Sequence, residues 1–100
     1  MTTTTRLDVL PDVPPIGDFV SGYEASSWDG IGAPVGTSPE IITVLNREVN
    51  AALADATFKA RLADLGAEPF ANSPAEFSKF IVEYIEKWGR VIRAAGIKAE

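Results

Sequence analysis

A long amphipathic stretch near the end of the sequence limits the folds that are open to this chain. Ser73-Pro74-Ala75-Glu76 has the residues of a capping box with proline at the first helical position, so a helix is predicted to begin there. Its apolar residues recur at helical spacing: Phe77, Phe80, Ile81, Tyr84, Ile85, Trp88, Val91, Ile92 and Ala95. Gly96 with Ile97 predicts a Schellman ending. A stripe this wide has to be covered by another element.

Two further helices are predicted upstream of that stretch. Thr37 and Glu40 have the spacing of a capping box, with Pro39 in the first turn. The apolar residues that follow trace one stripe: Ile41, Ile42, Leu45, Val49, Ala52 and Leu53. Asp55 is a candidate N-cap for a shorter helix, which Gly66 would close in the left-handed conformation.

The segments between the helices predict very little sheet. Residues 26–33, SSWDGIGA, indicate one short strand with Trp28 and Ile31 on opposite faces. Gly30 and Gly32 would weaken an ordinary strand, which favours a close backbone approach or a bend. Residues 67–70 are predicted as a short edge strand. Two strands cannot form a self-sufficient sheet, so the chain is predicted to be part of an α/β lobe.

The N-terminal part is rich in proline and lacks regular periodicity. Residues 6–25 predict an irregular segment with one short helical turn near residues 15–19. The opening MTTTTR has neither a basic nor an apolar region of a signal peptide, so none is predicted in this chain. Residues 1–9 are expected to be disordered or vector-derived.

Composition excludes several function classes. The sequence has no histidine and no cysteine, which removes Ser-His-Asp and Cys-His catalysis and the usual zinc sites. The net charge is −5, and an acidic surface does not attract nucleic acid. No apolar run approaches the ~20 residues that cross a bilayer. We therefore expect no catalytic residues, no metal, no cofactor and no nucleic-acid partner.

Two candidate polar sites have ordinary explanations. Glu83 and Glu86 could form a carboxylate pair, but Lys87 and Arg90 lie one turn further on, which favours a solvated face with Glu83–Lys87 and Glu86–Arg90 ion pairs. Trp28 and Asp29 could be a functional pair, or a buried tryptophan followed by a turn aspartate. The residues alone leave this second choice open.

Several short motifs, in order, together resemble one family. They are LPDVP at 10–14, Ser27, Trp28 and Gly30, Leu45-Asn46, the stretch from Ala52 to Asp55, LGAEP at 65–69 and KWG at 87–89. From about Leu10 to Lys98 the chain resembles the C-terminal third of Bug-type solute receptors. These are the extracytoplasmic substrate-binding proteins of tripartite tricarboxylate transporters.

The resemblance implies a fold class and a division of the chain. Complete receptors of this family have two α/β lobes joined by crossover strands, with a small carboxylate in the cleft. The expected fold is accordingly α/β, a partial lobe of a type II periplasmic-binding-protein-like fold, helix-rich with one or two short strands. Residues 10–98 would be the receptor segment, preceded by residues 1–9 and followed by a tail at residues 99–100.

The resemblance also implies a function. The chain is expected to be an extracytoplasmic solute-binding component, or a fragment of one, that is periplasmic and works with membrane subunits of a transporter. It is not expected to be an enzyme. The alternative is a truncated helical interaction module that oligomerises and binds no small molecule, and self-association is expected because the apolar stripes lack cover.

Ser27, Trp28 and Asp29 are the ligand-binding residues that the resemblance places in this chain, with most of the family site lying upstream. They would sit where the chain returns across the hinge. A carboxylate at Asp29 would repel an anionic ligand unless it is neutralised or turned away. Trp88 is expected to be structural, and Trp28 to have less packing around it and to be closer to function.

Overall fold

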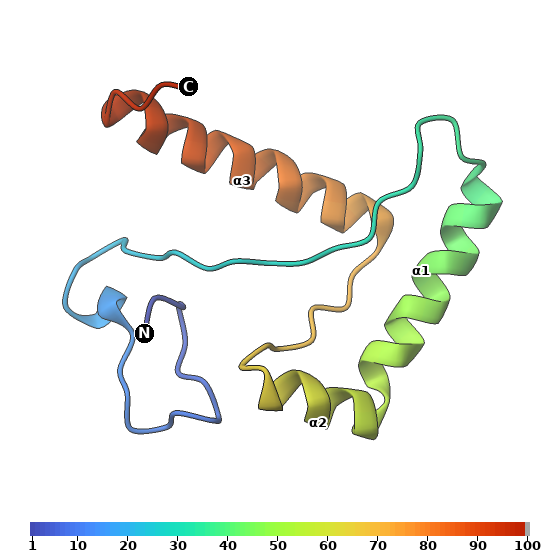
Figure 1. Ribbon diagram of the computed structural model, residues 1–100, viewed down its shortest axis with the longest axis horizontal. Helices are drawn as coiled ribbons and strands as arrows, with labels where there is room; N and C mark the ends of the chain where they lie inside the picture. The colour runs from blue at the N-terminus through green and yellow to red at the C-terminus, as the bar shows by residue number, and fades with distance from the viewer. Residues whose placement is uncertain (100) are drawn as a thin grey trace.

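The computed structural model describes residues 1–99 and shows three α-helices in an open arrangement (Figure 1). A 3₁₀ turn, η1, spans Ile16–Asp18, and the helices are α1, Pro39–Ala54, α2, Ala56–Asp64, and α3, Pro74–Ala94. Within residues 1–99, α1 contacts both α2 and α3, whereas α2 and α3 do not contact each other. The helices therefore follow one another around an open curve instead of forming a bundle.

Most helix ends follow the local chemistry of the sequence. At the start of α3, Ser73 Oγ accepts from the Glu76 N–H at 3.2 Å, and Glu76 Oε2 accepts from the Ser73 N–H at 2.7 Å. The predicted capping box is confirmed. Asp55 Oδ1 accepts from the Phe58 N–H at 2.9 Å, which confirms the N-cap of α2. The Schellman ending of α3 is confirmed by the Ile97 N–H, which donates to the Ile92 carbonyl at 3.1 Å.

The predicted capping box at the start of α1 is wrong. Ser38 is the N-cap residue of α1, and no side chain caps that end. Thr37 instead closes a turn before the helix, since its hydroxyl donates to the Pro34 carbonyl at 2.8 Å and its N–H donates to the same oxygen. Gly36, with φ at +87°, permits this turn. The Thr37 hydroxyl is therefore used in this turn and does not cap the helix.

The two predicted strands are also wrong. Residues 26–33 and 67–70 are extended but unpaired, and residues 1–99 contain no β-strand. A strand needs a hydrogen-bonded neighbour, and the described chain offers none to either segment. The structure is helix-rich, as the sequence predicted.

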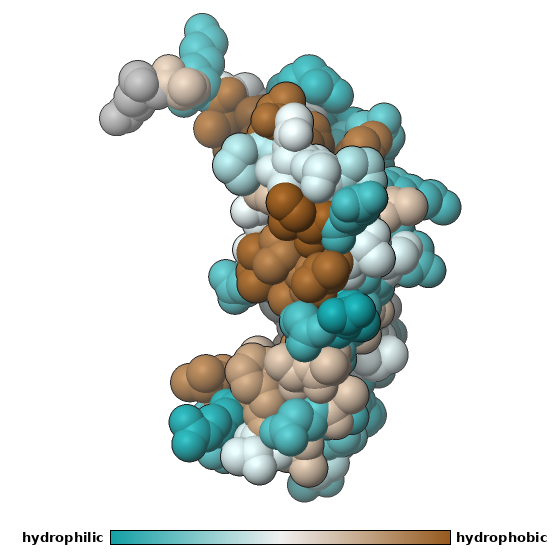
Figure 2. Space-filling view, turned by 90° about the vertical axis from the view of Figure 1, so that its right-hand side faces the viewer, coloured by the Kyte–Doolittle hydropathy of each residue, from teal (hydrophilic) through white to brown (hydrophobic). Residues whose placement is uncertain are grey.

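Very little of the chain is buried. Pro15 is the only buried residue among residues 1–99. The accessible surface is 8071 Å², whereas a folded protein of 10.7 kDa exposes about 5,500 Å². The radius of gyration is 16.5 Å, against about 13 Å for a compact domain of this length. Figure 2, which views the molecule from the side of α1, shows apolar surface gathered in the middle of that face.

The first two residues are hydrogen-bonded to residues 16 and 25. The Met1 carbonyl accepts from the Ile16 N–H at 2.8 Å, and the Thr2 carbonyl accepts from the Ala25 N–H at 2.9 Å. The helical turn predicted near residues 15–19 is confirmed as η1. The assignment of residues 1–9 stays a prediction, and part of the predicted tail, Glu100, lies outside the described residues. None of the described helices is both long and apolar enough to span a membrane.

Candidate functional site

Residues 24–33, called the extended segment below, run antiparallel to α3 (Figure 1). Glu24 pairs with Lys87, and the carbonyl of Ser26 accepts a hydrogen bond from the Tyr84 hydroxyl at 3.4 Å. Trp28 contacts Phe77, which lies two turns earlier on the helix. Later residues of the extended segment thus contact earlier residues of α3, as an antiparallel arrangement requires.

Side chains alternate between the two faces of the extended segment. Glu24 and Trp28 face α3, whereas Ser27, Asp29 and Ile31 are exposed, Ile31 at 72%. This is the period of two expected for extended backbone. The prediction that Trp28 and Ile31 lie on opposite faces is confirmed. The structure therefore separates the predicted site residues, because Ser27 and Asp29 share the outward face and Trp28 is turned to the helix.

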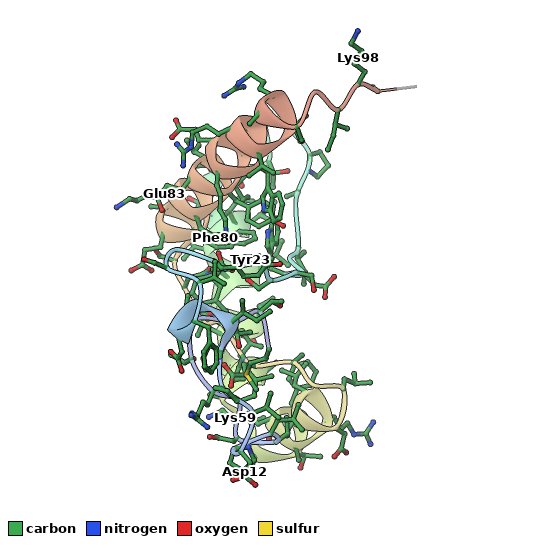
Figure 3. All side chains as sticks on the ribbon, turned by 90° about the vertical axis from the view of Figure 1, so that its left-hand side faces the viewer. Asp12, Tyr23, Lys59, Phe80, Glu83 and Lys98 are labelled. Carbon is green, nitrogen blue, oxygen red and sulfur yellow. The ribbon has the colours of Figure 1, made fainter. Side chains whose placement is uncertain are left out.

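Trp28 is the centre of an aromatic cluster. Its ring lies edge-on to three rings of α3, at centroid distances of 5.3 Å to Phe77, 5.4 Å to Phe80 and 5.7 Å to Tyr84. Phe80 points from α3 towards the extended segment in Figure 3 and also meets Phe70 at 5.5 Å. Edge-on aromatic pairs each contribute about 0.5–1.5 kcal/mol beyond the area they bury. This cluster holds the extended segment on the helix.

The expectation that Trp28 has less packing around it than Trp88 is wrong. Among aromatic rings of the described chain, Trp88 contacts Tyr84 alone, at 6.0 Å, and the Lys87 ammonium lies 5.5 Å from its ring centroid. The indole N–H of Trp88 is buried and has no acceptor among residues 1–99. Trp88 lies one turn after Tyr84 on α3. Trp28 contacts Phe77, Phe80 and Tyr84, so Trp88 lies outside this group of rings.

The backbone of the extended segment lies close to α3 at Gly30. A Cβ atom at Gly30 would lie 2.5 Å from Phe77 Cζ and 3.3 Å from Trp28 Cζ3, well inside van der Waals contact. The predicted close approach is confirmed at this glycine. Gly32 differs, because a Cβ there would have no atom within 4 Å.

A polar group closes the other end of the aromatic cluster. Lys87 Nζ forms an ion pair with the Glu24 carboxylate and donates to the Glu24 carbonyl at 2.7 Å, and Ser26 Oγ donates to Glu24 Oε1 at 2.6 Å. The hydrogen bond from Lys87, and then that from Ser26, holds the pKa of Glu24 below its ordinary value of 4.5. A shallow hollow of about 150 Å³ adjoins the pair.

This polar group was not predicted, because its two charged members are 63 residues apart. The predicted Glu83–Lys87 ion pair is wrong, since Lys87 turns to Glu24. Glu83 lies 3.8 Å from Lys79 Nζ instead and points away from the extended segment in Figure 3. The predicted Glu86–Arg90 pair is likewise not among the ion pairs of the described chain. The KWG motif at residues 87–89 was the sequence signal that could have pointed to Lys87.

A second polar contact positions α1. The side-chain amides of Asn46 and Asn50 each donate to the Asn72 carbonyl at 2.9 Å, just before α3 begins. Because the two asparagines lie one turn apart on α1, a single carbonyl holds that face of the helix. Asn46 belongs to the Leu45-Asn46 motif, which therefore has a structural role here.

The described residues do not provide a set of metal ligands. Residues 1–99 contain no cluster of three or more His, Cys, Asp or Glu side chains that could hold a metal ion. A second hollow, of about 290 Å³, lies between residues 7–9 and the α2 region, and includes Lys59. It is lined by neither Trp28 nor the Glu24–Lys87 pair.

The lowered pKa of Glu24 predicts a specific loss of stability in acid. A carboxyl group whose pKa is depressed in the folded state stabilises that state above its unfolded pKa, and this stabilisation is lost as the pH falls through the folded pKa. The unfolding free energy should therefore drop as the pH is lowered below 4.5, and Glu24→Gln should flatten this dependence. Denaturant melts between about pH 3 and 6 measure it.

Glu76 also contributes to the pH dependence of stability in that experiment. Its pKa is also lowered, first by the hydrogen bond from the Ser73 N–H, so part of the acid dependence persists in Glu24→Gln. Glu86→Gln, at an exposed position of α3, is the matched control. A Glu24→Gln chain that loses stability in acid as steeply as the wild type would contradict the role of the Glu24–Lys87 pair.

Comparison with solved structures supplies the class of protein to which this arrangement belongs. The chain is similar to a structure described as R. palustris Rpa4515 with adipate, with a TM-score of 0.83 and 38% identity, over 95% of this chain and 32% of that one. The class is that of solute-binding receptors of transporters. The model of the tripartite tricarboxylate transporter family receptors matches residues 1–97, and the chain belongs to that family.

Curated relatives agree with this assignment. The chain is 35% identical to Protein BugT of Bordetella pertussis over 99 residues, covering 96% of this chain and 30% of that protein. It is 30% identical to a UPF0065 protein of Bordetella bronchiseptica, covering 98% of this chain and 29% of the relative. The chain thus spans about 30% of the length of these relatives. The predicted resemblance to Bug-type receptors is confirmed.

Proposed function

We propose that this chain is the C-terminal part of a Bug-type receptor that binds a small carboxylate in the cleft between two lobes. The observation that carries the proposal is the match to the adipate-bound R. palustris protein, over 95% of the chain at a TM-score of 0.83. In this proposal residues 10–98 are one receptor segment. They form part of an α/β lobe of the type II periplasmic-binding-protein kind, flanked by residues 1–9 and 99–100.

The outward face of the extended segment is the part of this chain that we assign to the cleft. Ser27 and Asp29 share that face and are exposed, so the Ser27 hydroxyl can donate to a carboxylate. Trp28 anchors the segment to α3 from the other side. Lys87 is already paired with Glu24, so its charge is not free for an anionic ligand. Asp29 has to point away from the ligand, because two carboxylates repel each other.

The remaining parts of the proposal follow from the family. The complete receptor would work in the periplasm, deliver its ligand to membrane subunits of a tripartite transporter and catalyse no reaction. Two relatives, 35% and 30% identical to this chain, and the family model that matches residues 1–97 support this role.

The test compares ligand binding by this chain alone with ligand binding by a complete receptor that contains it. Calorimetry of the chain alone against adipate and a panel of di- and tricarboxylates should show no binding heat, because pocket ligands need most of their surface enclosed. The R. palustris protein carrying residues 10–98 in place of its matched third should bind a carboxylate. Within that chimera, Ser27→Ala should weaken binding about 10–100-fold, the cost of one hydrogen bond to a charged group.

Ser78→Ala, at an exposed position of α3, is the matched control and should leave the affinity unchanged. Micromolar binding by the chain alone would show a self-contained site and overturn the proposal. A chimera that binds no carboxylate of the panel would overturn it as well.

A second candidate function rests on the exposed apolar side chains. Ile41, Val44 and Leu45 of α1 are exposed at 53%, 46% and 46%, a pattern typical of an interface. The alternative is accordingly a helical interaction module that self-associates and binds no small molecule. Sedimentation of the chain alone distinguishes the two, because a self-associating module would show a molar mass above the 10.7 kDa of one chain.

A further inference from the structure

Ser27 is exposed, yet the residues on both sides of it are attached to α3. The Ser26 carbonyl accepts a hydrogen bond from the Tyr84 hydroxyl at 3.4 Å, and the Trp28 ring lies edge-on to three aromatic rings of the helix. The Ser27 hydroxyl is therefore carried by a short piece of backbone that is held in place before and after it.

Lys87 provides the polar part of this attachment. Its ammonium group forms an ion pair with the Glu24 carboxylate, donates to the Glu24 carbonyl at 2.7 Å and lies 5.5 Å from the centroid of the Trp88 ring. Ser26 Oγ donates to the other carboxylate oxygen, Glu24 Oε1, at 2.6 Å. Through one carboxylate group, Lys87 is thus connected to Ser26, the residue that precedes Ser27.

The Lys87–Glu24 pair is well suited to hold a distant segment in place. The two side chains are 32% and 29% exposed, whereas those of the Arg47–Glu48 pair are 68% and 63% exposed. A partly buried pair with additional hydrogen bonds is screened less by water and salt than a surface pair. The other two ion pairs of residues 1–99 join neighbours in sequence, one and four residues apart, so they hold no separate segment.

A fixed backbone at Ser27 lowers the cost of binding a ligand. A side chain that is mobile in the free protein has to be ordered when it contacts a ligand, and this ordering reduces the affinity. Contacts that order the residue beforehand remove that cost. Since the Lys87 ammonium is already paired with Glu24, it influences the affinity through the segment that it holds.

We propose that Lys87 is a positioning residue of the carboxylate site, which fixes, through Glu24 and Ser26, the direction in which Ser27 presents its hydroxyl to the ligand. This role rests on the proposed function, which assigns Ser27 to the cleft. Its consequence is that a lysine outside the ligand's contacts sets part of the affinity. A second consequence is that Glu24, although negatively charged, favours the binding of an anion.

Calorimetry of the chimera between the R. palustris protein and residues 10–98, titrated with adipate or a tighter-binding carboxylate of the same panel, tests this role. Lys87→Met should weaken binding about three- to tenfold, the cost of ordering one or two side chains, and Lys87→Arg should recover most of the loss. Added to Ser27→Ala, Lys87→Met should have less than about a twofold further effect, because nothing is left to position. A residue that serves overall stability alone would weaken both backgrounds equally.

Glu24→Gln distinguishes positioning from simple attraction between charges. Removing a negative charge would strengthen the binding of an anion if Lys87 acted through its charge alone. Positioning predicts the opposite, a loss of at least about threefold, because a neutral amide holds the ammonium group less strongly than a carboxylate does. This variant also takes the place of Lys87→Met if circular dichroism shows that Lys87→Met does not fold.

Arg90→Met is the matched control, because Arg90 is an exposed basic residue one turn after Lys87 on α3. It should change the affinity less than about twofold, since its distance from the extended segment leaves only a screened charge effect. An equal loss in Arg90→Met and Lys87→Met would show a general effect of positive charge on α3 and would overturn the positioning role.

The remaining outcomes distinguish failure of this role from failure of the proposed function. A chimera that binds no carboxylate of the panel overturns both. If the chimera binds a carboxylate, the positioning role alone is overturned by unchanged affinity in Lys87→Met, by stronger binding in Glu24→Gln, or by equal losses from Lys87→Met with and without Ser27. Full affinity in Ser27→Ala would likewise overturn it, while the carboxylate binding itself would still support a receptor.

Discussion

Trp28→Ala is expected to lower the free energy of unfolding by about 3 kcal/mol, more than Trp88→Ala does. The substitution removes three edge-on aromatic contacts at once and detaches the extended segment from α3. Trp88→Ala removes one aromatic neighbour and also removes a buried N–H that has no acceptor in residues 1–99. Since small domains have only about 5–15 kcal/mol of stability, the Trp28 variant should be largely unfolded in mild denaturant.

Urea unfolding followed by far-ultraviolet circular dichroism measures both variants without relying on the deleted fluorophore. Trp28→Phe is the matched control, because it keeps an aromatic ring at the centre of the cluster and should recover part of the loss. A Trp88→Ala chain that is less stable than Trp28→Ala would show that the cluster does not hold the fold together.

Gly30→Ala should cost about 1–3 kcal/mol of stability, the usual penalty for overpacking. The added methyl group would lie 2.5 Å from Phe77 Cζ, so either the ring or the extended segment has to move. Moving the ring breaks its contact with Trp28, whose centroid is 5.3 Å away. Denaturant melts of the single variants and of Gly30→Ala combined with Phe77→Leu measure the effect.

The neighbouring glycine provides the comparison. Gly32→Ala meets no atom within 4 Å and should be neutral, or slightly stabilising through the unfolded chain. If the clash is the cause, the double variant should be more stable than the sum of the two single losses implies. Equal costs at Gly30 and Gly32 would instead indicate a general need for glycine flexibility.

Helix ends were predictable because both partners of each contact lie within a few residues. The Ser73–Glu76 box and the Asp55 cap are complete in the local sequence. Thr37 had the same local pattern, but a turn at Gly36 competed for its hydroxyl. The strand at residues 26–33 was predicted in the right place and in extended form. It is unpaired because pairing depends on a neighbour that these residues cannot specify.

The site was less predictable than the fold. Motif similarity pointed to Ser27, Trp28 and Asp29, and alternation along extended backbone explains why they divide between two faces. The Glu24–Lys87 pair joins positions 63 residues apart, and helical spacing favoured Glu83 as the partner of Lys87 instead. Trp28 was expected to be loosely packed because it lies on a short, glycine-flanked segment that was predicted to border the cleft, whereas this segment packs on the aromatic residues of α3.

The shortage of buried surface has a thermodynamic consequence. The heat-capacity change of unfolding and the dependence of stability on denaturant both scale with the surface that unfolding exposes. Because 8071 Å² is already accessible in the folded chain, unfolding exposes less new surface than it does in a compact domain of this mass. Its heat-capacity change should fall below the roughly 1.2–1.5 kcal/mol/K typical of a 100-residue domain, its stability should vary little with temperature, and its melting transition should be broad. Cooperative melting would then be a property acquired on assembly with whatever covers the open faces of α1 and α3.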